Sequence, residues 1–217
     1  MDYTFWAPIK LSISIAITAG LLVLLLGLIL GKWMAHRRFK GKLFIETFLM
    51  LPLVLPPSVV GFLLIVIFGR NSFIGSIIEK LTGHSIMFTW WAAVIAATVV
   101  AFPLMYQSVK TGFQSVNPDI EDAARTDGAS EFNITLFVSI PLAIKAIVTG
   151  FILSFTRALG EFGATLMFAG NIPGKTQTLP TAIYVAIDSG NMELAWLWVI
   201  TTIFISFLML ASTYLIK

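Results

Sequence analysis

The sequence contains no cysteine, and this absence excludes disulfide bonds, thiol catalysis and cysteine-ligated metal sites. Histidine is nearly as scarce, because only His36 and His84 occur, and neither is close in sequence to a second metal ligand of its kind. Charged residues make up 12% of the chain, whereas a soluble domain has about 25%. This shortage of charge argues against a soluble domain, and the 58% hydrophobic content indicates a membrane protein.

Long stretches without charge predict the membrane-spanning helices. Runs of 20 or more uncharged residues occur at positions 11–30, 47–69, 86–109 and 194–216. A helix needs roughly 20 such residues to cross a bilayer core of about 30 Å. A fifth apolar stretch, residues 141–168, is interrupted by Lys145, Arg157 and Glu161. We therefore expect an all-α membrane protein with a single transmembrane domain over residues 1–217 and five spans, at about 8–35, 43–69, 86–116, 137–168 and 194–217.

Basic residues gather in one loop, and their position predicts the orientation of the chain. Residues 31–42 contain five lysines and arginines, whereas Lys10 alone precedes the first span. The positive-inside rule therefore places this loop in the cytoplasm, the N-terminus outside and Lys217 in the cytoplasm. A patch for lipid headgroups or nucleic acid is the alternative interpretation, but topology already accounts for these charges, and we expect no nucleic acid partner.

A charged segment interrupts the apolar sequence after residue 116, and its residues predict a helix, a turn and a second helix. Asn117 followed by Pro118 is a good helix start, because Asn caps the first turn and Pro suits the first helical position. Gly128 is suited to the left-handed conformation that ends a helix. Ser130 can cap the following helix. We expect the short helix at about residues 118–128, on the cytoplasmic side.

The short helix has the features of a docking element. Ala123 and Ala124 are small and permit close approach of another surface, and Glu121, Arg125 and Asp127 can fix the angle of the helix through charge-assisted hydrogen bonds. The alternative is an ordinary solvated loop helix. The residues alone do not choose between the two interpretations.

A resemblance favours docking. The spacing of Asp122-Ala123-Ala124, three residues, Gly128 and then Ile140-Pro141 resembles the "EAA" loop of ABC importer permeases, which forms a cytoplasmic coupling helix seated in a groove of the ATP-hydrolysing subunit. The family pattern ends in I-x-L-P, and here Ile140 replaces the leucine. The resemblance implies a set of ATPase-coupling residues: Glu121, Asp122, Ala123, Ala124, Arg125, Gly128, Ile140 and Pro141.

The stretch AGNIPGKTQ (169–177) partly matches the phosphate-binding loop motif. Its GKT ending fits that motif, but the motif also needs a glycine where Ala169 stands, and Gly170 is one residue out of place. No buried strand precedes the stretch, and the expected topology places it outside. We therefore predict no nucleotide site, no metal and no cofactor on this chain, and assign ATP hydrolysis to a separate subunit.

Two charges inside the fifth span are candidates for the transport pathway. Arg157 and Glu161 are four residues apart and so lie on one face of a helix. Charged residues within a membrane usually face the protein interior and pair with each other. A structural ion pair is the interpretation we favour for Glu161, whereas an Arg157 facing a pore would attract an anion.

Proline marks a further pathway candidate in LMLPLVLPPSVVGFLL (49–64). Pro52, Pro56 and Pro57 remove helix hydrogen bonds and force a kink. Irregular backbone is tolerated within a membrane only where it is buried in protein or lines a cavity. The kink serves either packing or a gate, and the sequence leaves both open.

The remaining pathway candidates follow Glu161. Gly163 suits close packing or a bent backbone, and Asn171 and Thr178 offer neutral polar groups near the expected outer mouth. Residues 179–187 are apolar but too short to span, so we expect a re-entrant or interfacial piece there.

A narrower resemblance covers the chain from about residue 8 to its end. RALGEFGATLMFAGNIPGKTQTLPTAIY (157–184) and EDAARTDGA (121–129) resemble the corresponding segments of molybdate importer permeases, with sulfate permeases as the nearest relatives. The resemblance implies the type I ABC importer permease fold in the cell membrane of a prokaryote. It also implies a homodimer with two ATPase subunits below it and an extracytoplasmic molybdate-binding protein above it.

Other functions remain to be weighed against molybdate or tungstate import. A sulfate or other oxyanion permease is the alternative within the same family. An anion channel would need a filter-like constriction, and an intramembrane enzyme would need paired catalytic carboxylates, a Ser–Lys dyad or a histidine cluster. The sequence shows none of these signatures, so we expect a transporter subunit and not an enzyme.

Overall fold

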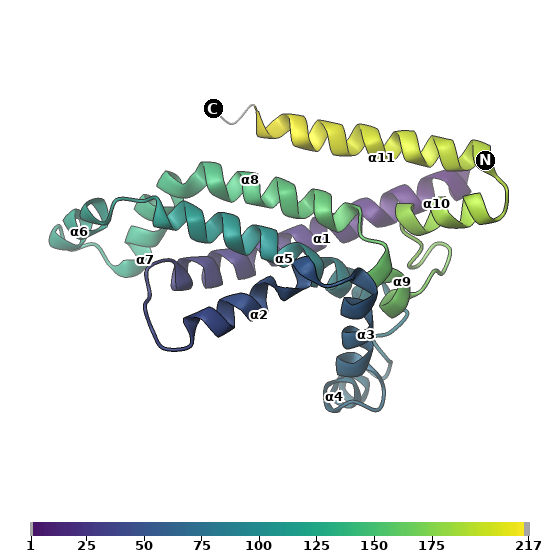
Figure 1. The fold of residues 1–217 in the computed structure, drawn as a ribbon, viewed down its shortest axis with the longest axis horizontal. Helices are drawn as coiled ribbons and strands as arrows, with labels where there is room; N and C mark the ends of the chain where they lie inside the picture. Colours follow the sequence, from purple (N-terminus) through teal and green to yellow (C-terminus); the bar gives the residue numbers. More distant parts are fainter. Residues whose placement is uncertain (1, 215–217) are drawn as a thin grey trace.

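The computed structural model describes residues 2–214, and all regular secondary structure among them is helical (Figure 1). Lys217, which we expect in the cytoplasm, lies outside the described residues. Four helices are long and apolar enough to cross a membrane: α1 (Asp2–Ala35), α5 (Trp90–Gln114), the continuous helix Glu131–Leu159 and α11 (Met192–Thr213). A bent pair of shorter helices brings the candidates to five.

The helix Glu131–Leu159 has three parts. It begins as α7 (Glu131–Ile134), passes through a π-helical turn, η1 (Thr135–Ser139), and continues as α8 (Ile140–Leu159). A π turn within an α-helix is rare and occurs frequently at functional sites. Here it follows the predicted docking helix, α6 (Pro118–Thr126), with the glycine turn and α7 between them.

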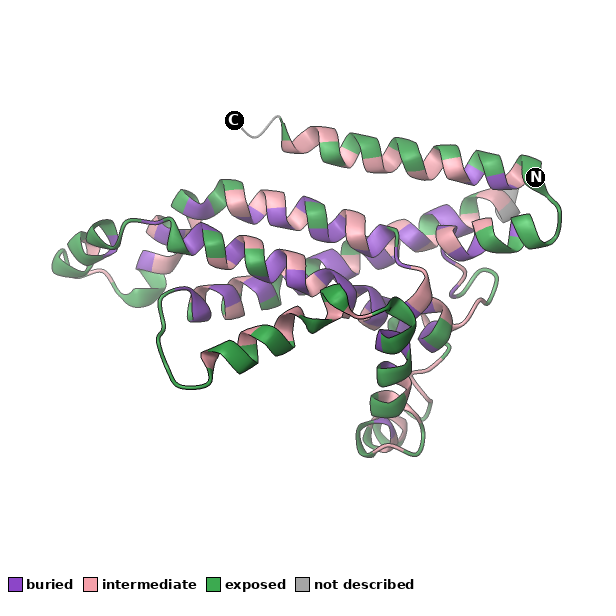
Figure 2. Ribbon diagram, in the orientation of Figure 1, coloured by how far each residue is buried: buried purple, intermediate pink, exposed green. Residues whose placement is uncertain are grey.

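The core of the molecule lies where α1, α5 and α8 pack together, and Figure 2 shows buried residues concentrated on these helices. Small residues allow the helices to approach closely, as is typical of membrane proteins. A Cβ atom added to Gly27 of α1 would lie 2.6 Å from Met105 of α5, and one added to Gly31 would lie 2.6 Å from Val109. These two contacts fix α1 against α5.

The proline-rich stretch is not one straight helix. It forms α2 (Lys42–Val54) and α3 (Pro57–Phe68), which are bent by 116°. The break falls at Leu55 and Pro56, so the predicted kink is confirmed and takes the form of a complete break. An ion pair of 2.7 Å between Glu46 and Lys110 fastens α2 to α5.

Short helices lie beyond the long ones, away from α6. After α3 comes α4 (Phe73–Thr82), and Figure 1 shows both projecting away from the long helices. Helix α8 ends at Leu159 and does not continue to residue 168 as expected, because Gly160 ends it and the Glu161 side chain caps a new helix, α9 (Gly163–Ala169). The apolar stretch at residues 179–187, which is too short to span, lies in a ten-residue helix, α10 (Leu179–Asp188), and α11 follows along one edge.

Candidate coupling and pathway sites

Helix α6 forms as its sequence predicts. The Asn117 side chain accepts a hydrogen bond from the backbone N–H of Asp119 at 3.0 Å, and Pro118 occupies the first helical position. Gly128 ends the turn in the left-handed region, at φ +87°. Ser130 then caps α7 by accepting from the N–H of Asn133 at 3.3 Å. The predicted helix, glycine turn and second helix are all confirmed.

Glu121 anchors α6 to the membrane-spanning helices. Its residue is 8% exposed, and one carboxylate oxygen accepts from the Ser139 hydroxyl at 2.5 Å and from the Lys32 ammonium at 3.1 Å. Lys32 also donates to Ser139 at 2.7 Å, which closes a triangle. Burial raises the pKa of the Glu121 carboxyl, but the hydrogen bonds from Ser139 and Lys32 outweigh it and lower the pKa below its ordinary value. The carboxylate therefore stays charged and joins α6, η1 and α1.

Arg125 fastens α6 to the helix that follows it. Its guanidinium donates to Glu131 at 2.6 and 3.1 Å and to Asp122 at 2.6 Å. The hydrogen bonds to Glu131 and Asp122 raise the pKa of Arg125. Asp127, which we expected to share this task, has no ion-pair partner in the part of the chain that the structure describes.

The opposite face of α6 is open. Ala123 is exposed on this face, whereas Ala124, three residues after Glu121, lies nearer the anchored side and is half-buried. Two larger apolar side chains lie exposed close to them in sequence, Ile120 at 45% and Phe132 at 74%. Small residues beside exposed apolar ones form a surface suited to a protein partner.

Ile140 and Pro141 lie apart from that face, at the start of α8. Ile140 lines a cavity of about 790 Å³ together with Glu121 and Arg125, whereas Pro141 is exposed. The predicted coupling residues therefore divide into an outward face on α6 and inward contacts that hold α6 in place. Sequence reasoning missed Lys32 and Ser139, because nothing in the local pattern links them to a helix so distant along the chain.

Arg157 and Glu161 form an ion pair at the end of α8. Their closest atoms are 2.7 Å apart, and Glu161 is 2% exposed. The second carboxylate oxygen of Glu161 accepts from the backbone N–H of Ala164 at 2.8 Å, at the start of α9. This geometry fits the structural interpretation, since the pair shapes the break between α8 and α9.

The break between α8 and α9 lies against the break between α2 and α3. A Cβ atom added to Gly163, at the start of α9, would lie 2.9 Å from the Pro57 ring. Pro56 and Pro57 themselves are exposed. Gly163 thus allows α9 to pack tightly against the first turn of α3.

The polar candidates beyond α9 are mostly buried. The Asn171 side-chain oxygen is buried and has no hydrogen-bond partner among the described residues. Thr178 is 4% exposed and lies 3.3 Å from the hydroxyl of Thr181. The next residue, Leu179, donates its N–H to the Ser12 hydroxyl at 2.7 Å, so this segment is tied to α1.

The GKT loop closes on itself. The backbone N–H groups of Lys175, Thr176 and Gln177 all donate to the carbonyl of Ile172. The Thr176 hydroxyl accepts from the N–H of Ile172 at 2.9 Å. The N–H groups that a phosphate-binding loop would offer to a nucleotide are therefore occupied.

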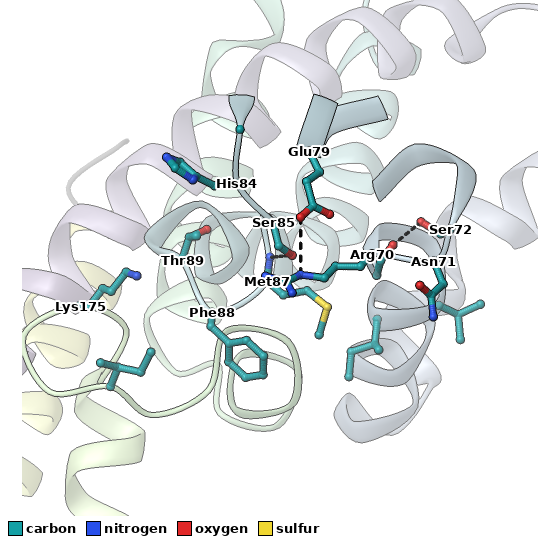
Figure 3. Close-up of a pocket in the computed structure, with 15 residues that line it drawn as sticks. Arg70, Asn71, Ser72, Glu79, His84, Ser85, Met87, Phe88, Thr89 and Lys175 are labelled. Carbon is teal, nitrogen blue, oxygen red and sulfur yellow. Dashed lines mark hydrogen bonds and ion pairs between the residues drawn. The ribbon is translucent and has the colours of Figure 1, made fainter. Parts of the chain in front are cut away.

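A wide cavity that the sequence did not indicate opens beside this loop (Figure 3). It measures about 1090 Å³, and its lining includes Arg70 and Glu79, whose side chains are 3.7 Å apart. His84 and Lys175 contribute from two further segments. The cavity is lined by residues from α3, α4, the α3–α4 and α4–α5 connections and the GKT loop, so it lies beside the projecting helices α3 and α4, away from α6.

Comparison with known proteins gives concordant results. The "Putative molybdenum transport system permease protein YvgM" of Bacillus subtilis (strain 168) is 62% identical over 206 residues, which cover 95% of this chain and 91% of that protein. The Molybdenum transport system permease protein ModB of Escherichia coli (strain K12) is 40% identical over 188 residues, covering 87% of this chain and 82% of that protein.

Solved structures share the fold at low sequence identity. A chain of the MetNI methionine ABC transporter in inward-facing conformations superposes with a TM-score of 0.73 at 16% identity, covering 100% of this chain and 97% of that one. A chain of a bacterial alginate ABC transporter gives a TM-score of 0.75 at 14% identity, covering 98% and 78%. The expected all-α type I importer permease fold is confirmed.

The model of one family matches nearly the whole chain. The family is described as "Binding-protein-dependent transport system inner membrane component", and the match extends over residues 23–217. This description agrees with the apolar helices and with the permeases named above. The chain therefore belongs to the family of binding-protein-dependent transport system inner membrane components, and it is a transporter subunit and not an enzyme.

Proposed function

We propose that this chain is the membrane-spanning subunit of an ATP-driven importer of molybdate, with tungstate as an alternative substrate of the same charge and shape. The proposal is supported by two relatives named for molybdenum transport, at 62% and 40% identity over most of the chain. Sulfate import is the alternative within the family. An anion channel is not favoured, since the family is binding-protein-dependent.

The proposed assembly contains two copies of this chain. Cyclic dimers are the commonest symmetric assembly, and a pathway between two copies would present two docking helices to two ATPase subunits. The exposed apolar surface of α2, which has no buried residue, is available for contact with lipid or with the second copy. An extracytoplasmic molybdate-binding protein would deliver the oxyanion from the other side.

The proposed coupling mechanism uses the two faces of α6. Its outward face, with Ala123 and Ile120, would seat in a groove of the ATPase, and the small Ala124 beside it would permit a close approach. When ATP draws two ATPases together, each moves its α6, and the contacts of Glu121 pass this movement to α1 and η1. The single observation that carries this proposal is the triangle of Glu121, Lys32 and Ser139. Alternating access then follows as rigid-body movement of the spans.

The proposed orientation places the N-terminus outside and the C-terminus in the cytoplasm. It is supported by five basic residues at positions 31–42 against one before the first span. Reporter fusions at Tyr3 and Lys217 test it, and they should report opposite sides of the membrane. Both ends on one side would contradict an odd number of spans.

Transport assays in vesicles test the substrate and the class of function together. The chain would be reconstituted with its ATPase and binding protein, and molybdate uptake measured with and without ATP. We expect uptake only when all components and ATP are present, inhibited by excess tungstate and not by sulfate. Uptake without ATP would indicate a channel, and uptake of sulfate in place of molybdate would indicate the alternative permease.

A further inference from the structure

The seam between α5 and α8 has a polar groove on its surface. A depression of about 390 Å³ is lined by Gln107, Ser108 and Thr111 of α5 and by Lys145, Ala146 and Thr149 of α8. All of these residues except Ala146 are polar, although they lie in two of the helices that are apolar enough to span a membrane.

The helices touch beneath this groove. A Cβ atom added to Gly150 of α8 would lie 2.5 Å from Ser108, and one added to Gly112 of α5 would lie 2.7 Å from Ala146. Gln107 is seven residues from the end of α5 at Gln114, which is roughly 10 Å at 1.5 Å per residue. The groove therefore lies on the outside of a closely packed pair, in the half of the membrane that adjoins α6.

The exposed side chains of α5 differ from those of α11. Every exposed residue of α11 between Trp196 and Leu210 is apolar, as lipid requires. On α5, the exposed residues after Trp91 are Gln107, Thr111 and Gln114, all of them polar. Polar groups facing lipid would be unfavourable, so this side of α5 faces water or protein.

The hydrogen bonding of hydroxyl groups also separates the groove from the apolar helix surfaces. The hydroxyls of Thr98, Thr156, Thr201 and Thr202 each donate to the carbonyl four residues earlier in their own helix. Within residues 2–214, the hydroxyls of Ser108, Thr111 and Thr149 have no hydrogen-bond partner, and the Lys145 ammonium has no acidic partner. The groove thus offers several free polar groups and one cation, with no carboxylate in its lining.

We propose that this groove lines the inner half of the translocation pathway and carries a hydrated, doubly charged oxyanion past Lys145 toward the cytoplasm. Free hydroxyls and an amide can hydrogen-bond to a hydrated anion without holding it tightly. One exposed ammonium attracts the anion but does not form a closed binding site around it. The inference rests on the proposed import function for its direction and its substrate.

Cysteine accessibility tests the groove directly, because the chain has no cysteine of its own. Gln107→Cys, Thr111→Cys and Thr149→Cys would be made singly in the assembled importer, with Ile203→Cys and Phe204→Cys on α11 as matched controls that are 62% and 61% exposed. An anionic, membrane-impermeant methanethiosulfonate would be added to inside-out vesicles. We expect modification of the groove cysteines at least ten times faster than of the controls, slowed by saturating molybdate.

Equal rates at groove and control positions would overturn the proposal. So would groove cysteines that resist the reagent and form a disulfide with the second copy, since this face would then be a protein interface. The reagent test does not require molybdate import. If the wild-type importer fails to transport molybdate, the proposed function fails while the accessibility of the groove is still measured.

Lys145 provides a second test through transport rates. Lys145→Gln should lower the maximal uptake rate about tenfold and leave KM unchanged, because the separate binding protein sets the apparent affinity. Lys145→Arg should restore most of the rate by keeping the charge. A lysine that merely extends to the membrane surface would predict normal uptake in both variants, and that result would remove Lys145 from the pathway.

Discussion

Glu121 and Glu161 are both buried glutamates held by a cation, yet they connect very different parts of the chain. Glu161 pairs with Arg157, four residues before it, and caps a helix that begins two residues after it. Glu121 pairs with Lys32, 89 residues away, and accepts from Ser139, 18 residues away. One carboxylate shapes a local bend, and the other joins three separate elements.

We propose that similar chemistry serves two different purposes, depending on how far apart in sequence the contacting residues are. A contact between sequence neighbours sets the direction of the chain. A contact between a peripheral helix and two spans would pass a movement of that helix to both of them. Loss of the first should therefore reduce stability, whereas loss of the second should separate ATP hydrolysis from transport.

The largest expected effect is on stability, from Arg157→Gln. This variant leaves Glu161, which is 2% exposed, without its cation, and removal of one partner of a buried pair costs about 3–5 kcal/mol. We expect a clearly lower unfolding temperature in detergent. Arg157→Gln combined with Glu161→Gln should recover much of the loss, because the charge and its partner are then both absent.

A different result for Arg157→Gln would assign Arg157 to the transport pathway and not to a structural role. If Arg157→Gln keeps a normal unfolding temperature, binds the ATPase and yet fails at uptake, and Glu161→Gln gives no rescue, then Arg157 acts in the pathway. Normal stability together with normal uptake would contradict both roles.

Lys32→Met should have the next largest effect, and mainly on coupling. The Glu121 side chain that would lose its cation is 11% exposed, against 2% for Glu161, so the expected loss of stability is about 2 kcal/mol, below that expected for Arg157→Gln. Uptake should fall more than tenfold while the ATPase continues to hydrolyse ATP. Lys32→Arg should retain part of the uptake, and normal transport by Lys32→Met would show that the triangle transmits nothing.

Gly128→Val tests the other end of α6. Gly128 has φ +87° with no atom within 4 Å of an added Cβ, so the variant strains the backbone without a steric clash. The left-handed conformation costs about 1–2 kcal/mol for a residue with a side chain. We expect less ATPase to copurify while membrane insertion stays normal. Gly128→Asn, which tolerates this conformation better, should be milder, and full uptake by Gly128→Val would make the segment a mere connector.

The smallest effect concerns pH. Because the pKa of Glu121 is lowered in the folded protein, its stabilising contribution is complete above the ordinary glutamate pKa of about 4.3 and is lost as pH falls below it. Binding of the ATPase should therefore be constant from neutral pH to about 5 and weaken in more acidic buffer. The Glu121→Gln variant should bind the ATPase more weakly at every pH, and its binding should not show the additional loss in acid that protonation of Glu121 causes. Identical pH profiles would contradict the anchoring role.

The sequence predicted those features that depend on neighbouring residues. Uncharged runs indicated the long helices, and Asn117, Pro118 and Gly128 marked the start and end of α6 correctly. The proline pair at 56–57 predicted the break between α2 and α3, although not its angle of 116°.

Features that depend on packing could not be read in the same way. The contact of Lys32 with Glu121 requires α1 to end beside α6, and only the arrangement of the spans decides this. The end of α8 at Leu159 was missed, because an apolar run does not reveal that the Glu161 side chain caps a new helix. The groove on α5 was missed for a related reason, since polar residues scattered through a span show a common face only after the helix is built.

The π turn η1 (Thr135–Ser139) has a consequence for the rotational phase of one helix. A π turn contains about one residue more than an α turn, and each residue of an α-helix corresponds to a rotation of about 100°. Deleting one residue from this turn would restore a uniform α-helix and rotate α7 against α8 by that amount. Ser139 and Glu131 could then no longer both face α6. The extra residue shifts the rotation of one part of this helix against the other, so that Glu131 can contact Arg125 while Ser139 contacts Glu121.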